Sequence, residues 1–493
     1  MRLLVSGFFA LLVVLLIVPS AGANTITVNT TADNADLGAS NCSLRNAVLS
    51  ADADARAGSC VVGSGEDVIK MPAGNYRLTV EGAGEYNGFT GDIDLISADS
   101  LTIEPASPGD EVTIDGLGSD RIFDHATGSG TLTLRNLALV NGSVSGADNN
   151  GGALRLGKGL TQFEGVLLSG NRATGNGGGI YVYGQGRLEM VNSTVTGGQA
   201  GKSGGGIFTE PDTYAALASV TITGNTADSD ADGSGDGGGI AAGGTFGLAN
   251  SILAGNTDSS PILIDKAPDC SSEAGFLPAY VISTQAIGSG ACLAAPGATA
   301  NQSPVDPQLS ALTDNDGPTL TMAIAPGSPA IDSAGSVAPN LCPEKDQRGV
   351  PRPAGKCDIG AFEYDPNGVP PLALPGLSKP TAATATFDGT KLRVLFKCPG
   401  RFKPRCSTTA TPLTKKAGGS AMSKLAKATV KPGKTAVLVF TIKPALRDQI
   451  EALTFSGKKS LVVRYVVKSK RVGSRKAKRP AKLFQTLGVR VKV

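Results

Sequence analysis

The chain has 493 residues, of which 66 are Gly and 29 are Pro, whereas Trp is absent and His occurs once. An excess of Gly without a Gly-X-Y period excludes collagen and favours a turn-rich, strand-rich protein over a helical one. A single His excludes a metal site built from several histidines. The hydrophobic fraction of 41% suffices for a large core, so wholesale disorder is not expected.

The formal net charge of +3 conceals two segments of opposite sign. Residues 1–375 contain 17 basic and 39 acidic residues, a balance of −22, whereas residues 376–493 contain 28 basic and 3 acidic residues, a balance of +25. Such asymmetry indicates a domain boundary between the two segments. It also suggests that the basic segment binds a partner of opposite charge.

The chain begins with the features of a secretory signal peptide. Arg2 precedes an apolar run, and the small residues Ala21-Gly22-Ala23 follow it. This pattern predicts a signal peptide over residues 1–23, cleaved after Ala23. The alternative is an uncleaved membrane anchor, for which the run is short. No later stretch of the sequence is long enough to span a bilayer, so we expect a secreted, extracellular or envelope-associated protein without a membrane span.

Eight cysteines fall into four pairs that are close in sequence. An even number in an exported chain favours disulfide bonds. Eight cysteines allow 105 connectivities, so nearest-neighbour pairing is an assumption. A metal site is the alternative, but the chain lacks a C-x-x-C motif and nearly lacks His. The predicted pairs are Cys42 with Cys60, Cys270 with Cys292, Cys342 with Cys357, and Cys398 with Cys406.

The middle of the chain is repetitive. Five similar segments can be aligned, with separations of 29, 27, 27 and 31 residues between their matching positions. These positions are Asn136, Gly165, Asn192, Ser219 and Asn250. Glycine-rich pieces recur between the segments and begin at Gly151, Gly177, Gly204 and Gly237. A Gly-punctuated period of this length is typical of a solenoid.

The repeats predict a parallel β-helix. Short apolar-alternating stretches with β-branched residues favour strands. Neither the helical segments nor the fixed Leu offsets of a leucine-rich repeat occur. In a β-helix the coils pair with one another and bury Val, Ile and Leu in the lumen, while Gly and Asn form the corners. Apolar spacing over residues 43–51 predicts a helix that caps the first coil, with Ser43 as its N-cap.

The sequence divides into five parts. After the signal peptide, we predict an N-terminal cap with the first coils over residues 24–125, and the repeats with a closing segment over 126–365. A Pro-rich linker covers 366–378. Residues 379–493 are predicted to form a small β-sandwich, with one helix near 444–453. Its strand-like runs are 391–397, 435–442, 460–467 and 483–493.

Three motifs resemble a known group of proteins. The segment CSLRNAV at Cys42 resembles the entry motif of secreted bacterial β-helix proteins of the CSLREA type. The GGGI pieces resemble the polymorphic outer-membrane-protein repeat. The stretch from Val305, together with DQRGVPRPAGKCDIGAFEY at Asp346, resembles the closing module of the same group. The resemblance covers residues 24–364 and implies a right-handed β-helix on the cell surface or in the secretome. It supplies no catalytic residues, and Met322 stands where family members often carry His.

One acidic segment is a candidate calcium loop. Alternating carboxylates followed by Gly resemble the opening of a calcium-binding loop, in which several oxygen ligands converge on one ion. Gly239 occupies the position at which an EF-hand carries its bidentate Glu, and no flanking helices are expected. The alternative is a solvated acidic turn. The candidate ligands are Asp228, Asp230, Asp232 and Asp236.

The sequence predicts no catalytic residues. An adjacent Asp pair and a Gly-His-Gly motif, expected in polygalacturonase-like hydrolases, are both missing, and His125 is expected at a turn. Tyr181 and Tyr183 share one strand face and form either a small binding patch or part of the packing. Four arginines recur near the strands and either line one face or point separately into solvent. They are Arg135, Arg155, Arg172 and Arg187.

The basic C-terminal segment is expected to bind polyanions such as an acidic envelope polymer or glycan, rather than nucleic acid. The alternatives are docking on the acidic β-helix and improved solubility. We therefore predict a monomeric, adhesin-like surface protein without enzymatic activity. The alternative is a polysaccharide lyase or glycoside hydrolase acting on acidic glycans. The candidate polyanion-binding residues are Lys468, Lys470, Arg471, Arg475, Lys476, Lys478, Arg479 and Lys482.

Overall fold

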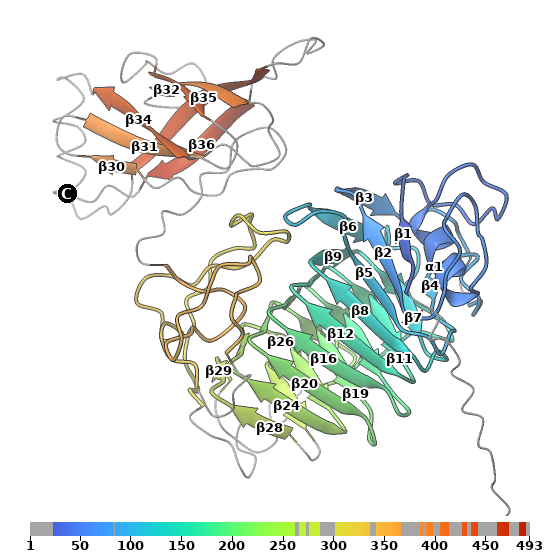
Figure 1. The fold of residues 1–493 in the computed structure, drawn as a ribbon. Helices are drawn as coiled ribbons and strands as arrows, with labels where there is room; N and C mark the ends of the chain where they lie inside the picture. The colour runs from blue at the N-terminus through green and yellow to red at the C-terminus, as the bar shows by residue number, and fades with distance from the viewer. Residues whose placement is uncertain are drawn as a thin grey trace, which may run out of the picture.

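The middle of the chain forms a parallel β-solenoid, which Figure 1 shows as a stack of coils running from blue to yellow-green. The computed structural model describes residues 23–82, 84–261, 266–272, 276–285, 301–335 and 342–365. It also describes the backbone of strands β30 to β36 in the C-terminal segment. The predicted stacking of the repeats is confirmed, because each strand pairs in parallel with its counterparts in the coils before and after it.

Two long sheets form two sides of the solenoid. Sheet A contains β1 (Thr25–Thr27), β2 (Asp67–Met71), β5 (Leu101–Pro105), β8 (Thr131–Arg135), β12 (Leu160–Glu164), β16 (Arg187–Val191), β20 (Tyr214–Ala218), β24 (Thr245–Ala249) and β28 (Phe276–Ala279). Sheet B contains β3 (Gly74–Arg77), β6 (Val112–Asp115), β9 (Leu137–Val140), β13 (Leu167–Ser169), β17 (Thr194–Thr196), β21 (Thr221–Thr223), β25 (Ile252–Ala254) and β29 (Ile282–Ser283).

Two further sheets complete each coil, which runs through sheets A, B, D and C in that order. Sheet C contains β4 (Ile93–Asp94), β7 (Phe123–His125), β11 (Leu154–Leu156), β15 (Ile180–Val182), β19 (Ile207–Thr209), β23 (Ile240–Ala242) and β27 (Cys270–Ser272). Sheet D contains β10 (Ser143–Val144), β14 (Arg172–Ala173), β18 (Gln199–Ala200), β22 (Thr226–Ala227) and β26 (Thr257–Asp258).

The lumen holds the hydrophobic core. Because strand side chains alternate between two faces, every second residue points inward. In sheet A the side chains of Leu134, Phe163, Met190, Leu217 and Leu248 are all buried and stand one above another in register. Identical registers in successive coils therefore produce one continuous core along the solenoid.

The aligned repeat positions lie at the corner between sheets A and B. All five have positive φ angles, from 46° at Asn250 to 69° at Gly165. Asn and Gly tolerate this left-handed conformation better than most residues. The repeat alignment is therefore confirmed, since residues matched in sequence occupy equivalent corners. Ser219 also adopts the conformation, with a φ of 54°.

A helix, α1 (Leu44–Asp52), lies at the N-terminal end and contacts β1 and β2. Ser43 is its N-cap residue and accepts a hydrogen bond from the Asn46 backbone amide. The first predicted disulfide, Cys42–Cys60, directly precedes the helix and joins Cα atoms 4.7 Å apart. The cysteine pair therefore fixes the start of α1 to the loop that follows it.

Two of the four predicted cysteine pairs are confirmed, Cys42–Cys60 and Cys342–Cys357. Cys270 is also disulfide-bonded, but its predicted partner Cys292 lies outside the described residues. Cys398 lies outside them as well, so its pairing with Cys406 stays a prediction.

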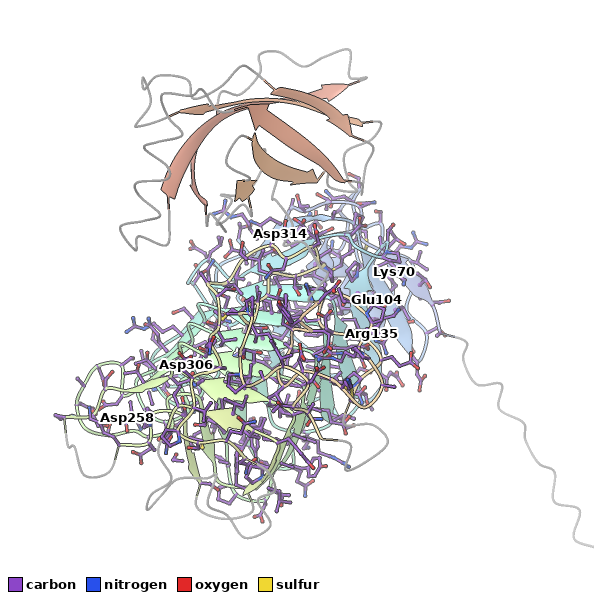
Figure 2. The ribbon with its side chains drawn as sticks, turned by 90° about the vertical axis from the view of Figure 1, so that its left-hand side faces the viewer. Lys70, Glu104, Arg135, Asp258, Asp306 and Asp314 are labelled. Atoms are coloured by element: carbon purple, nitrogen blue, oxygen red, sulfur yellow. A yellow bond between two sulfur atoms is a disulfide. The ribbon has the colours of Figure 1, made fainter. Side chains whose placement is uncertain are left out.

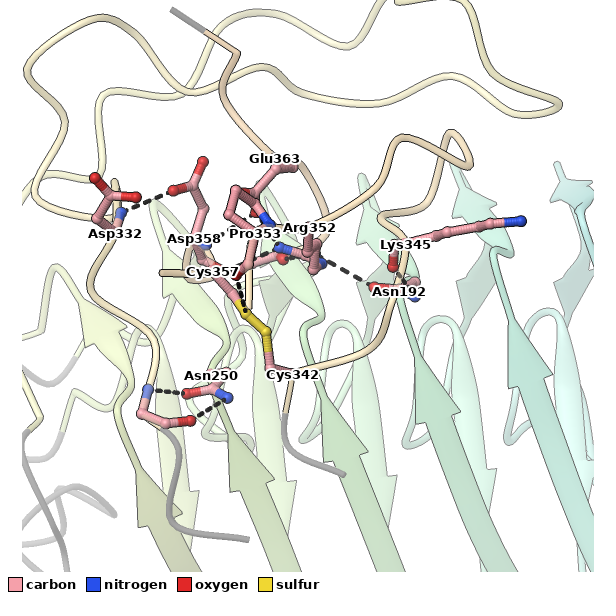
Figure 3. The surroundings of a disulfide bond; sticks show 12 residues. Asn192, Asn250, Asp332, Cys342, Lys345, Arg352, Pro353, Cys357, Asp358 and Glu363 are labelled. Carbon is pink, nitrogen blue, oxygen red and sulfur yellow. Dashed lines mark hydrogen bonds and ion pairs between the residues drawn. A yellow bond between two sulfur atoms is a disulfide. The ribbon is translucent and has the colours of Figure 1, made fainter. Parts of the chain in front are cut away.

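Residues 342–365, hereafter the strap, return along the outer face of sheet B (Figure 3). The Thr194 hydroxyl donates to Gln347 Oε1 at 2.6 Å, and the Ala361 amide donates to Thr221 Oγ1 at 3.1 Å. The buried Arg352 bonds Glu363 within the strap and Asn192 on the solenoid. Apolar residues close the interface. They are Ile252, Ala254, Ile282, Ile324, Ala330, Ile359 and Phe362.

In the C-terminal segment the structure describes seven antiparallel strands in two sheets. One sheet contains β30 (Ala385–Phe387), β31 (Lys391–Lys397) and β34 (Thr435–Thr441). The other contains β33 (Ala426–Val430), β32 (Arg405–Leu413), β35 (Leu461–Val472) and β36 (Leu483–Val489). The predicted helix near 444–453 and the predicted signal peptide up to residue 22 lie outside the described residues. In the described part of the chain, no helix combines the length and hydropathy that a membrane span requires.

Candidate functional site

A row of charged and aromatic side chains runs along the outer face of sheet C. One residue from each of five successive strands contributes, and the strands are in register. The row is Asp94, Asp124, Arg155, Tyr181 and Phe208. Two acids, one cation and two aromatic rings are therefore placed side by side by the stacking of the coils alone.

Arg45 of α1 positions the loop that leads into this row. Its guanidinium is completely buried and bonds both carboxylate oxygens of Asp33, at 2.9 and 3.1 Å. The same group donates to the backbone carbonyls of Gly88, Gly91 and Asp92 at 3.0, 2.7 and 2.7 Å. One side chain therefore connects the entry helix to the loop that carries Asp92.

Arg121 joins two coils of the site. Its Nη1 atom donates to Asp92 at 2.8 Å and to Asp124 at 3.2 Å. Its Nη2 atom donates to the carbonyls of Asp148 and Asn150, at 3.1 and 3.3 Å. The Arg121 side chain is only 5% exposed, so these charge-assisted bonds are formed away from water, where they are strongest.

Arg155 extends the network towards the surface. It forms ion pairs with Asp124 and Asp148. The ring of Tyr86 lies over its guanidinium, with 5.5 Å between the ring centroid and Cζ. Tyr86 is 54% exposed, so the network reaches solvent at this ring. We name Asp92, Asp94, Asp120, Arg121, Asp124, Asp148 and Arg155 the Asp–Arg cluster.

Acids outnumber bases in the Asp–Arg cluster, with five carboxyl groups against two guanidinium groups. Desolvation raises the pKa of Asp92 to about 8 and that of Asp94 to about 7, with neighbouring carboxylates adding to the effect. Burial also raises the pKa of Asp120. The excess of buried acids therefore disfavours the ionised form of Asp92, Asp94 and Asp120, which Arg121 only partly offsets.

Four buried polar atoms of this cluster have no hydrogen-bond partner among the described residues. They are Asp120 Oδ2, Asp124 Oδ1, Arg121 Nε and Arg155 Nε. Buried polar groups in folded proteins are nearly always satisfied by protein, water or a bound ligand. Two acceptors and two donors within this buried network therefore need water or another small polar group to satisfy them.

Aromatic rings continue the row beyond the cluster. Tyr181 stacks on Tyr183, with ring centroids 5.4 Å apart, and on Phe208 at 5.6 Å. The Tyr181 hydroxyl bonds Glu210, and burial raises the pKa of Tyr183. Tyr181 is buried between its neighbours, whereas Tyr183 and Phe208 are partly exposed. The two predicted tyrosines are thus part of a larger aromatic surface.

The four arginines do not line one face. Arg135 and Arg187 project from sheet A, Arg172 lies on sheet D, and Arg155 alone belongs to the Asp–Arg cluster. Arginines that recur near the strands in the sequence therefore lie on different sides of the coil. The interpretation as separate, solvent-facing residues holds for Arg135, Arg172 and Arg187 but is wrong for the buried Arg155.

On sheet A, charged side chains alternate in sign along the outer face. Lys70 pairs with Glu104, and Arg135 lies between Glu104 and Glu164, at 3.6 and 3.0 Å. Figure 2 shows Lys70, Glu104 and Arg135 in sequence across the coils. All four side chains are at least 23% exposed. We name these four residues the sheet A ladder.

The candidate calcium loop brings three of its four acids together. Ligand atoms of Asp228, Asp230 and Asp232 lie within 4.8 Å of one another, and this group does not include Asp236. It is the only such group among the described residues. Asp228 is buried, and its carboxylate accepts from the amides of Asp232 and Gly233 at 2.9 and 3.0 Å. Asp228 thus closes the turn, while Asp230 and Asp232 are exposed.

His125 lies in strand β7, so its expected place at a turn is wrong. It points to the same side of the strand as the buried Phe123, and its Nδ1 atom lies 3.0 Å from Thr161 Oγ1. Burial lowers the pKa of His125 to about 4. The residue is a neutral core side chain.

Sequence reasoning missed most of the Asp–Arg cluster. Asp92, Asp120, Arg121 and Asp148 lie outside the aligned repeat positions, and no motif marks them. The segment from Asp120 to Asp124 offered a weak signal, because an Asp-Arg pair directly precedes a strand with a second Asp. Only the pairing between coils brings these residues into contact.

The predicted polyanion-binding residues are only partly described. Lys468, Lys470 and Arg471 lie in β35, whose backbone pairs with β32. The other five lie outside the described residues. A comparison of the sequence with models of known protein families gave no match. A comparison with curated proteins gave no significant match either.

Proposed function

We propose that this chain is a secreted or cell-surface protein with a non-enzymatic adhesion or presentation role, and that it binds glycans on the outer face of sheet C. The aromatic row beside Arg155 carries the proposal. Sugar rings stack their apolar faces on aromatic side chains, and their hydroxyls bond charged side chains at the edges. Tyr86, Tyr183 and Phe208 supply exposed ring surface, and Asp148 supplies a 30% exposed carboxylate.

The burial of the acids favours binding over catalysis. The side chains of Asp92 and Asp124 are 3% and 1% exposed, and both are held by Arg121. A catalytic carboxyl group must come within hydrogen-bond distance of the substrate. Paired acids beneath the surface instead hold the ligand-facing side chains in place.

A glycan panel tests the binding role. The full chain is expected to bind a subset of immobilised glycans, and Phe208→Ala and Tyr86→Ala are expected to weaken that binding roughly tenfold, since a ring contact contributes about 1 kcal/mol beyond its buried area. Tyr214→Ala is the matched control, because Tyr214 is a 39% exposed ring on sheet A. Equal binding by all three variants would refute the role of sheet C.

A lyase or hydrolase acting on acidic glycans is the second candidate. The observation in its favour is the pair Asp92 and Asp124, which share Arg121 while the pKa of Asp92 is raised to about 8. A neutral acid beside an ion-paired carboxylate matches the two roles of acid–base catalysis. The decisive assay incubates the glycan panel with the chain and measures absorbance of unsaturated products and release of reducing ends. Product formation that Asp124→Asn abolishes would establish the enzyme.

The basic C-terminal segment is proposed to retain the protein on an acidic envelope polymer or glycan. Its balance of +25 supports electrostatic attachment. Binding of the full chain to an acidic polysaccharide is expected to fall steeply between 0.05 M and 1 M salt, where the Debye length shrinks to ~3 Å. Binding that persists unchanged in high salt would contradict this part of the proposal.

The loop at Asp228, Asp230 and Asp232 is proposed to bind calcium from the extracellular medium. Three carboxylates with ligand atoms within 4.8 Å of one another support it, because a hard cation relieves their repulsion. Calcium is expected to raise the melting temperature of the chain but not that of the Asp230→Ala/Asp232→Ala variant. The absence of a calcium shift in the unmodified chain would exclude the site.

The proposal also includes the finer architecture. The solenoid winds in a right-handed sense, as nearly all parallel crossovers do, α1 caps the first coil, and the seven C-terminal strands form a β-sandwich. The three motifs that resemble those of secreted β-helix proteins of the CSLREA type support the same architecture. Secretion predicts that the mature chain begins at Asn24, which N-terminal sequencing of exported protein tests. A mature chain that retains residues 1–23 would contradict it.

A further inference from the structure

A shallow, solvent-open hollow lies at the corner where sheet B continues into sheet D. It has a volume of about 440 Å³, which falls within the range of small-ligand sites. Three successive coils contribute to it, at the ends of β6, β9 and β13. None of its residues belongs to the Asp–Arg cluster or to the aromatic row. The lining residues are Asp115, Leu117, Gly118, Asn141, Gly142, Ser143, Gly170 and Arg172.

Bare backbone forms part of the hollow. A Cβ atom added at Gly142 would lie 2.1 Å from the Gly152 carbonyl oxygen, so no other residue fits there. A Cβ atom at Gly118 would meet nothing within 4 Å. Glycine backbone therefore lines part of the hollow, and the space beside Gly118 is open.

Arg172 provides an unpaired cation at this site. It is exposed and forms no ion pair among the described residues. Its neighbours in register on sheet D are the uncharged Ser143 and Gln199. A guanidinium group offers two parallel donors to a carboxylate. In a segment with a balance of −22, an arginine without an acidic partner is available for an external one.

Asp115 provides the complementary acceptor. Its Oδ1 atom accepts from the Leu117 amide and from Asn141 Nδ2, both at 3.0 Å. Its Oδ2 atom accepts no hydrogen bond from the described residues. The carboxylate is thus held in place with one oxygen free to accept from a hydroxyl group, and the Ser143 hydroxyl lies in the same lining.

We propose that this hollow binds a sugar residue that carries a carboxylate, with Arg172 bonding the carboxylate and Asp115 accepting from ring hydroxyls. An acidic peptide such as oligoglutamate offers carboxylates but no hydroxyl donors for Asp115, whereas each residue of a uronic acid chain offers one carboxylate and several hydroxyl donors. The inference is independent of the glycan-binding role proposed for sheet C, because the two surfaces share no residue.

Calorimetric titration of the full chain with trigalacturonate tests the proposal. Arg172→Gln is expected to weaken binding roughly tenfold to hundredfold, as loss of a charge-assisted hydrogen bond does. Asp115→Asn is expected to weaken it less, because the amide oxygen still accepts from Leu117 and Asn141. The basic C-terminal segment contributes the same background to every variant, so the difference between variants reports the hollow.

Two controls make the test decisive. Arg187→Gln removes an exposed arginine of sheet A and should leave the affinity unchanged. Maltotriose, which lacks a carboxylate, should bind at least tenfold more weakly. Equal trigalacturonate binding by the unmodified chain and Arg172→Gln would overturn the proposal. Tighter Arg172-dependent binding of a triglutamate peptide would also overturn it, since the ligand would then be an acidic peptide.

Discussion

The outer faces of sheets A and C carry in-register rows of charged residues, yet the two rows differ in depth. The sheet A ladder alternates Lys70, Glu104, Arg135 and Glu164 in the open, where Arg135 is 40% exposed. In the Asp–Arg cluster the side chain of Arg121 is 5% exposed. Identical strand pairing therefore produces a solvated charge row on one side and a buried network on the other.

Covering segments account for this difference. The loop that carries Asp92 is held by Arg45, and the carbonyls of Asp148 and Asn150 lie against Arg121. These segments exclude water from the cluster, which strengthens its ion pairs and raises the pKa of its excess acids. On the solenoid, the loops between strands thus decide whether a row of charged side chains is exposed to solvent or buried.

The largest expected effect comes from removing the shared cation of the cluster. Arg121→Met leaves Asp92 and Asp124 without their common partner and is expected to lower the free energy of unfolding by about 3–5 kcal/mol. Arg135→Met in the sheet A ladder is the matched control, with an expected loss of about 0–1 kcal/mol. Urea denaturation measures both. Equal losses would show that burial does not distinguish the two rows.

Removing the N-terminal disulfide tests whether the entry loop supports the cluster. The Cys42→Ser/Cys60→Ser variant is expected to lose about 3 kcal/mol, because the bond closes a loop of 18 residues. Hydrogen exchange should increase around Asp92 in this variant but not around Arg135. If exchange near Asp92 stayed unchanged, the helix and its disulfide would not hold the cluster.

The two rows should also differ in their response to pH. The pKa of Asp92 is raised to about 8 in the fold, against about 3.9 in an unfolded chain. The folded state therefore binds more protons between these values, and stability falls as the pH rises through that window. Asp92 contributes at most about 1.4 kcal/mol per pH unit.

Comparison with Asp92→Asn isolates this contribution. The stability of that variant should fall less between pH 6 and pH 7 than the stability of the unmodified chain. Glu104→Gln, in the sheet A ladder, should leave the slope unchanged. Parallel pH profiles for the unmodified chain and Asp92→Asn would mean that Asp92 is ionised in the folded protein.

The smallest effect is expected from salt on the exposed ladder. Glu104→Gln should change the stability by less than about 1 kcal/mol, and 1 M salt should remove most of the difference by screening. Thermal unfolding at low and high salt measures it. A loss that is large and independent of salt would show that the ladder is as well shielded as the cluster.

The repeat sequence was sufficient to predict the solenoid. Asn136, Asn192 and Asn250 could be aligned because only a few residue types tolerate the left-handed corner, and all three occupy it. The pairs Cys42–Cys60 and Cys342–Cys357 followed from proximity along the chain. Three acids of the Asp228 loop could be grouped for the same reason, since residues so close in sequence can converge within one turn.

The site on sheet C could not be predicted in this way. Asp92 and Arg121 are 29 residues apart, and Arg155 and Asp124 are 31 apart, so their contacts depend on the pairing of whole coils. The contacts of the strap could not be predicted either, because Arg352 bonds Asn192, which lies 160 residues earlier in the chain. No local motif in the sequence shows that these polar side chains are buried and paired with each other.

By itself, the sequence determined the period, the corners and the alternation of apolar residues, because each depends on backbone preferences and side-chain spacing within a few residues. Tertiary structure alone decided which outward-facing residues became buried. Arg135 and Arg155 occupy strands of similar composition, yet the Arg135 side chain is 40% exposed, whereas that of Arg155 is 9% exposed and lies under the Tyr86 ring. The free energy of a charge depends on its surroundings, and in a solenoid those surroundings come from neighbouring coils.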